Sequence, residues 1–94
     1  MRELVLTPRF TRAFRRLVRR DRPAQLRIED VLRQMEQDVF APGLATHKLS
    51  GVLAGLWACS CGYDCRIVLA LEVDGDAGLE TIVLVDIGAH DEVY

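Results

Sequence analysis

The spacing of apolar residues changes once along this chain, from a helical period to an extended one, and this change constrains the fold most strongly. Two apolar stripes with helical spacing occupy the first half. They consist of Phe10, Phe14, Leu17 and Val18, and of Ile28, Val31, Leu32, Met35 and Val39. After the polar connection "ATHKLSG", the segments "LWACSC", "CRIVLALEV" and "LETIVLVDIG" have the composition of strands. The pattern predicts a helical half followed by a β half.

Local signals predict where these elements begin and end. The short apolar run "ELVLT" at 3–7 is expected to be a strand, and Thr7-Pro8 then supplies a capping hydroxyl and a proline for the first helical position. Asp21-Arg22-Pro23 separates the two helices, and Pro42-Gly43 is expected to end the second. Turns are expected at Gly62-Tyr63-Asp64 and at 74–78.

The resulting order, β-α-α-β-β-β, predicts an α+β fold in which a helical hairpin packs on a small, mostly antiparallel sheet. The last three strands are expected to form a meander, with the first strand added at an edge. The 94 residues are enough for one domain, 1–94. The sequence has no apolar run of about 18 residues and no charged-then-apolar leader, so we expect a cytoplasmic protein with no membrane partner.

Charge is divided unevenly along the chain. Residues 1–33 carry ten basic and four acidic residues, a balance of +6, whereas residues 34–94 carry two basic and ten acidic residues, a balance of −8. This division indicates that the first third meets an anionic partner, either a nucleic acid or an acidic protein. The alternative is that "RAFRRLVRRDR" is only a solvated helix face.

The three cysteines, Cys59, Cys61 and Cys65, are odd in number and clustered, unlike a disulfide framework. Their C-x-C-x3-C spacing also differs from that of a structural zinc site. We therefore expect small, partly buried, apolar thiols, and no metal or other cofactor.

Three side chains outside the apolar stripes are suited to chemistry. His47 and His90 titrate near neutral pH and, in one cleft, would form a proton donor and acceptor pair. Arg66 is the only basic residue on the predicted C-terminal strands, where its planar donor fork suits a phosphate. A salt bridge from Arg66 to Asp64 or Asp86 is the alternative.

Taken together, "HKLSGVLAGLWACSCGYDCRIVLAL" and "LVDIGAHDEVY" resemble the RelE/ParE superfamily of bacterial toxins from type II toxin–antitoxin modules, in particular its YafQ-like branch. The most specific segments are His-x-Leu-x-Gly at 47–51, Gly-Tyr-Asp-x-Arg at 62–66 and the "DIG-x-HDEVY" ending. The resemblance covers nearly the whole chain and implies the same β-α-α-β-β-β order.

The resemblance implies an endoribonuclease that cuts messenger RNA on the ribosome without a metal, by attack of a ribose 2′-hydroxyl on the adjacent phosphate. It assigns a role in activity to His47 and Asp64, contact with the scissile phosphate to Arg66, the general acid to His90, and stacking or proton transfer to Tyr94. RNA binding is expected at Lys48 and at Arg12, Arg16 and Arg19 of the arginine-rich helix, whose polar face we expect to dock on ribosomal RNA.

The chain also departs from the family pattern. Cys61 stands where YafQ-like enzymes carry a histidine, and Ala58, Cys59 and Ser60 stand where RelE-like enzymes carry lysines. A ParE-like poison of DNA gyrase and a non-catalytic binding relic of the same fold therefore remain alternatives.

A further implication of the resemblance is a cognate antitoxin, whose acidic or amphipathic segment would wrap the toxin in a hetero-oligomer. The basic first third supplies the matching charge. The apolar strand "LVLT" supplies an edge that such a segment would extend or cover.

Overall fold

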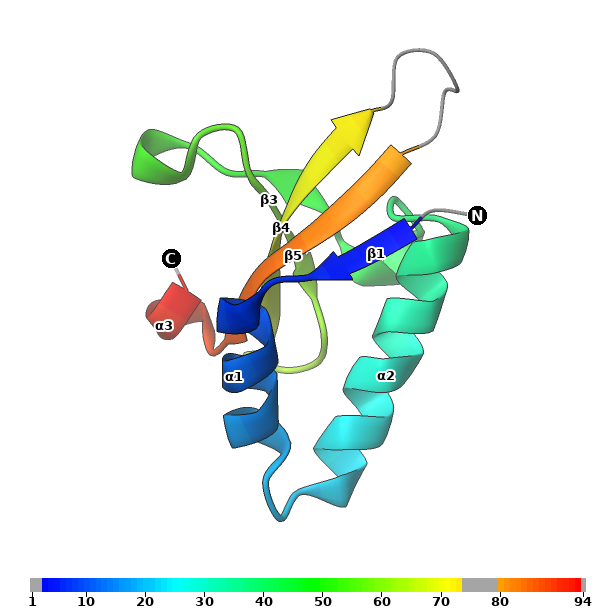
Figure 1. The fold of residues 1–94 in the computed structure, drawn as a ribbon, viewed down its shortest axis with the longest axis vertical. Helices are drawn as coiled ribbons and strands as arrows, with labels where there is room; N and C mark the ends of the chain where they lie inside the picture. Colours follow the sequence, from blue (N-terminus) through cyan, green and yellow to red (C-terminus); the bar gives the residue numbers. More distant parts are fainter. Residues whose placement is uncertain (1–2, 74–79, 94) are drawn as a thin grey trace.

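The computed structural model describes residues 3–73 and 80–93 (Figure 1). The turn expected at 74–78 and the terminal Tyr94 lie outside the described residues. In chain order, the main elements are β1 (Glu3–Leu6), α1 (Pro8–Val18), α2 (Arg22–Gln37), β2 (His47–Lys48), β3 (Trp57–Ser60), β4 (Arg66–Val73), β5 (Glu80–Gly88) and α3 (His90–Val93). Two short 3-10 helices, η1 (Pro42–Leu44) and η2 (Gly51–Leu53), flank β2.

The strands form one sheet in the order β1-β5-β4-β3-β2. The meander of β3, β4 and β5 and the edge position of β1 confirm the expected topology. β1 pairs with β5 in parallel, and all other pairs are antiparallel. β2, a two-residue strand at the opposite edge, lies in the segment that the sequence indicated only as a polar connection.

Side-chain caps fix the start of both long helices, at Thr7 as expected and also at Asp21. The Thr7 hydroxyl accepts a hydrogen bond from the backbone N–H of Phe10, and the Asp21 carboxylate accepts one from Ala24. The second helix ends earlier than expected, at Gln37 rather than at Pro42. Asp38 stops it, because its backbone is extended and its carboxylate accepts the N–H of Phe40 in an Asx turn.

The core lies between the helices and one face of the sheet. Its fully buried members are Phe10 from α1, Ile28 and Met35 from α2, and residues of β3, β4 and β5 that include Cys59, Ile67, Leu69, Ile82 and Leu84. Because side chains alternate along a strand, the inward direction of Ile67 and Leu69 turns Arg66 and Val68 toward the opposite face. That second face of the sheet carries the functional candidates.

The expectation of three thiols is wrong, because Cys61 and Cys65 form a disulfide. The turn between β3 and β4 brings their Cα atoms to 5.0 Å, within the range that a disulfide spans. Cys59 is the free thiol, fully buried in the core. Burial raises the pKa of Cys59 from its usual 9.0 to about 12, an effect that the nearby Arg66 charge only partly opposes.

In the described part of the chain, no helix has the length and apolar character needed to cross a membrane.

Candidate active site

The turn between β3 and β4 is a closed and rigid loop. Its backbone is bonded from Cys61 N–H to the Cys65 carbonyl at 3.0 Å and from Cys65 N–H to the Gly62 carbonyl at 3.2 Å. A disulfide between the side chains of Cys61 and Cys65 closes the same loop a second time. Gly62 has φ +128° and Asp64 has φ +53°, left-handed values that glycine adopts easily and that aspartate tolerates better than most residues. The Gly-Tyr-Asp sequence is therefore suited to this turn.

Arg66 follows the turn and is held by it. Its Nη1 donates to the carbonyl of Cys65 at 2.8 Å and to that of Gly62 at 3.3 Å. Within residues 3–73 and 80–93, Arg66 forms no salt bridge with Asp64 or Asp86, the alternative considered from the sequence. Asp86 instead pairs with Arg9 at 3.1 Å. Backbone carbonyls thus orient the Arg66 guanidinium without neutralising its charge, which keeps it suited to an anionic ligand.

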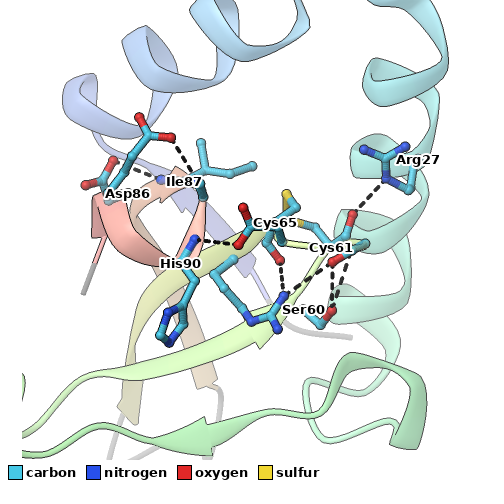
Figure 2. The surroundings of a disulfide bond; sticks show 12 residues. Arg27, Ser60, Cys61, Cys65, Asp86, Ile87 and His90 are labelled. Carbon is cyan, nitrogen blue, oxygen red and sulfur yellow. Dashed lines mark hydrogen bonds between the residues drawn. A yellow bond between two sulfur atoms is a disulfide. The ribbon is translucent and has the colours of Figure 1, made fainter.

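The segment after β5 folds into the single-turn helix α3. The Glu92 carboxylate accepts the N–H of Ala89 at 3.2 Å, and the N–H of His90 bonds Asp64 Oδ1 at 3.3 Å (Figure 2). Gly88 lies so close to Val93 that an added Cβ would approach its Cγ1 to 3.3 Å. These contacts anchor α3 against the β3–β4 turn and place His90 beside it.

One open cleft, of about 760 Å³, brings three of the predicted catalytic residues together. Its lining consists of Ser60, Gly62, Tyr63, Asp64, Arg66, His90 and Asp91. The His90 ring is about half exposed, and its Nδ1 lies 3.7 Å from Asp91 Oδ1. A guanidinium, an imidazole and a carboxylate around one cleft are able to bind a phosphate and to transfer a proton beside it.

His47 lies on the same face of the sheet as Arg66 but outside this cleft. His47 on β2 pairs with Ala58 on β3, and Ala58 pairs with Val68 on β4. Val68 is two residues from Arg66 along β4 and therefore faces the same side. Strand spacings and rise place the His47 and Arg66 Cα atoms about 12 Å apart. His47 lines a second hollow of about 430 Å³ with residues of the 48–53 segment. Its Nδ1 lies 2.9 Å from the carbonyl of Ala45, which only accepts, so Nδ1 carries the proton.

The predicted RNA-binding residues lie apart from the cleft. Lys48 lies on the helix side of the sheet, where its Nζ is 5.5 Å from the Trp57 ring. Arg12 and Arg16 line a groove of about 230 Å³ between α1 and α3, together with Arg9, Ala13, Asp86, Ile87, Glu92 and Val93. Arg19 is exposed at the end of α1. The groove and the cleft lie on opposite sides of α3.

The sequence analysis gave no role to Tyr63, Ser60 or Asp91, although all three line the cleft. Tyr63 had a sequence signal, since a large aromatic residue at the tip of a Gly-x-Asp turn has no partner in the turn to pack against. Ser60 and Asp91 had none, because only the folded geometry brings β3 and α3 to the same place. Within the described ranges, no group of three or more His, Cys, Asp or Glu side chains is arranged to hold a metal ion.

No protein-family model matches the sequence, and no curated protein matches it. Solved structures do match over nearly the whole chain. A YoeB/ParE toxin from Agrobacterium tumefaciens is 22% identical with a TM-score of 0.75, covering 94% of this chain and 98% of that one. A variant of YafQ from E. coli is 11% identical with a TM-score of 0.73, covering 100% and 99%.

A third match is the YoeB-YefM complex from Staphylococcus aureus, 14% identical with a TM-score of 0.70, covering 96% of this chain and 98% of that one. These matches confirm the predicted fold: the chain has the α+β fold of the RelE-, YoeB- and YafQ-like toxins. At such identities, it is the fold that is shared.

Proposed function

From this toxin fold, we propose that the protein is the toxin of a type II toxin–antitoxin system and acts as a metal-independent endoribonuclease on messenger RNA at the ribosome. The observation that carries the proposal is the shared cleft, in which Arg66, oriented by two carbonyls, and His90, carried on α3, line the same space. Asp64 links the two through the turn and the N–H of His90.

The chemistry needs a base, an anion site and an acid. The substrate 2′-hydroxyl loses its proton to a base and attacks the adjacent phosphorus. Arg66 stabilises the charge that develops on the phosphoryl oxygens. His90, protonated, donates its proton to the leaving 5′-oxygen, so that a 2′,3′-cyclic phosphate and a 5′-hydroxyl result. His47 is the candidate base, because its Nδ1 proton bonds the Ala45 carbonyl and leaves Nε2 with the lone pair.

Substitutions in the cleft test this activity. His90→Ala should slow cleavage of an RNA transcript by about 10² to 10⁴, and Arg66→Ala by about 10² to 10³. Leu26→Ala, on the exposed surface of α2, is the control and should cleave like the wild type. Cleavage that continued unchanged in both cleft variants would refute the proposed site. Mapping the 2′,3′-cyclic ends separates this chemistry from that of a contaminating hydrolase.

Docking on the ribosome is proposed for the polar face of α1. Arginines that neutralise RNA phosphates make affinity fall with salt, by about 0.7 to 0.9 in log–log slope for each phosphate. Replacing Arg12, Arg16 and Arg19 with glutamine should therefore weaken ribosome binding and reduce that slope. An unchanged affinity and slope would leave these arginines as a solvated face.

The partner we propose is a cognate antitoxin in a cytoplasmic hetero-oligomer, with 1–94 acting as one domain. A fold shared with the toxin of the YoeB-YefM complex supports this, as do the charge of α1 and the exposed Val5 and Leu6 of the edge strand β1. Expression alone should slow growth, and coexpression with an adjacent antitoxin-sized reading frame should give a complex that purifies intact. Harmless expression of the lone chain would count against a toxin.

A gyrase poison is the second candidate. One observation favours it: β3 consists of Trp57, Ala58, Cys59 and Ser60 and so carries no cation where RelE-like enzymes carry lysines. Double-strand breaks in DNA after induction, with transcripts intact, would support this candidate over the nuclease.

A further inference from the structure

Tyr63 occupies the tip of the β3–β4 turn, and its side chain is fully in solvent, with an exposed fraction of 102%. It therefore contributes nothing to the core, and folding does not explain it. The same residue lines the cleft beside Arg66 and His90. A large aromatic ring held in solvent at the edge of a reactive cleft is typical of a group that binds a ligand.

We propose that Tyr63 is a nucleotide-positioning residue, whose ring stacks on the base next to the scissile phosphate. This inference rests on the proposed function and deepens it, since it adds a base site to the phosphate site at Arg66. Proteins hold single-stranded RNA by stacking its splayed bases on aromatic side chains while cations contact its backbone. Tyr63 and Arg66 lie three residues apart across one tight turn, which brings these two kinds of contact together.

The charge in the cleft favours such an uncharged contact. Among the described residues that line the cleft, Arg66 is the only permanent cation, and Asp64 and Asp91 oppose the approach of a polyanion. Arg66 is partly buried, and one charge-assisted contact to a phosphate contributes about 10- to 150-fold in affinity. Stacking of one base contributes about 5- to 150-fold and involves no charge. Stacking therefore adds a contribution of the same order, and the two carboxylates do not oppose it.

The turn presents the ring on a rigid support. The disulfide closes its base, and Arg27 of α2 donates from Nε to the Cys61 carbonyl at 2.9 Å from the other side (Figure 2). Gly62 allows this contact, because an added Cβ would lie 2.6 Å from Arg27 Nε. A ring carried on a backbone that is already ordered loses little conformational entropy when it binds.

The probe is a short RNA that is 2′-O-methylated throughout, and so not cleavable, with 2-aminopurine at several positions. Stacking on a ring quenches 2-aminopurine fluorescence. Wild-type protein should quench the signal, and Tyr63→Ala should lose most of the quenching and bind about 5- to 150-fold more weakly. Tyr63→Phe should behave like the wild type. Because stacking carries no charge, the salt dependence of binding should be the same in all three proteins.

Leu26→Ala is the matched control, an exposed apolar side chain on α2 outside the cleft, and it should quench like the wild type. Melting temperatures of Tyr63→Ala and wild type should agree, since the ring is fully exposed. A large drop in the melting temperature would show that the ring supports the fold, and would overturn the inference.

The outcomes separate this inference from the proposed function. Suppose that the wild type cuts transcripts, and that Tyr63→Ala quenches the probe and binds it as tightly as the wild type does. The role of Tyr63 is then refuted and the nuclease stands. If quenching depends on Tyr63 but no transcript is cut, the base site stands and the nuclease fails. If the wild type does not bind this RNA, the base site is refuted, and the nuclease is refuted as well if messenger RNA on the ribosome also stays uncut.

Discussion

The backbone N–H of His90 donates a hydrogen bond to the carboxylate of Asp64, with 3.3 Å between the nitrogen and Oδ1. This contact joins α3 to the β3–β4 turn across 26 positions of sequence. The position of the candidate acid therefore depends on the Asp64 carboxylate, in addition to any role that Asp64 has in catalysis.

Replacing Asp64 separates that positioning role from its charge. Asp64→Ala removes the acceptor and should slow single-turnover cleavage by about 2- to 10-fold, the usual contribution of one hydrogen bond. Asp64→Asn keeps an acceptor oxygen and should retain the wild-type rate. Both variants remove a negative charge from the cleft, so both should bind RNA more tightly. Equal rates for the alanine and asparagine variants would mean that the His90 contact does not matter.

Reduction of the Cys61–Cys65 disulfide should destabilise the protein and slow cleavage. A ring of five residues stabilises the fold by about 2 kcal/mol through the entropy of the unfolded chain. Urea unfolding with and without a thiol reductant measures this difference. The double variant Cys61→Ala/Cys65→Ala is the control, and it should resemble the reduced protein and give no response to reductant. A reductant response in the double variant would point to another cause.

Gly62→Ala should destabilise the turn by about 1–3 kcal/mol, because alanine is strained at φ +128° and its Cβ would meet Arg27. Adding Arg27→Ala should recover the share of this lost stability that comes from the clash with Arg27, and should leave the share that comes from the strained backbone. Gly43→Ala is the control, since nothing lies within 4 Å of an added Cβ there. Denaturant unfolding compares the variants, and equal losses at Gly43 and Gly62 would contradict the prediction.

The free energy of unfolding should fall as the pH rises from about 9 to about 12, because of Cys59. With the pKa of the folded thiol raised to about 12, the unfolded chain loses this proton first, and deprotonation then favours unfolding. The loss is on the order of 4 kcal/mol over the whole window. Cys59→Ala lacks the thiol, so its stability should depend less steeply on pH there. Parallel curves for the two proteins would show that the thiol titrates normally.

Local signals in the sequence predicted most of the fold. The Thr7 cap, the break at Asp21-Arg22-Pro23 and the apolar stripes act over one or two turns of helix, so their effect is visible in a short window. The strand-like composition of 65–73 and 79–88 similarly predicted the two longer strands of the meander. Asp38 was the exception, because an Asx turn overrode the apolar stripe that continues to Val39.

The elements that the sequence did not indicate depend on distant contacts. α3 has four residues, too few to form a helix alone, and its contacts with Asp64 and Gly88 stabilise it. β2 has two residues and exists through its pairing with β3. The prediction of three free thiols failed because it rested on the number of cysteines. It did not consider that a tight turn brings Cys61 and Cys65 within bonding distance.

For the site, the sequence supplied residue types and the fold supplied their arrangement. Asp64, Arg66 and His90 meet in one cleft, whereas His47 and Lys48 line a separate hollow, with the Lys48 Nζ over the Trp57 ring on the helix side of the sheet. The alternation of side chains along β2 decides the last point, since adjacent residues face opposite ways. The catalytic roles of these residues, and that of Tyr94, stay predictions for the experiments above.

The parallel pairing of β1 with β5 also governs how the chain folds while it is being made. Thr7 bonds the carbonyl of Leu84, 77 positions later, and β1 finds its register only on β5. Contacts of such long range form late in folding, because the intervening loop must first be closed. A nascent chain that still lacks β5 carries its arginine helix but no finished sheet and no α3. On the proposed function, the nascent chain therefore cannot act on the ribosome that synthesises it before β5 and α3 have been made.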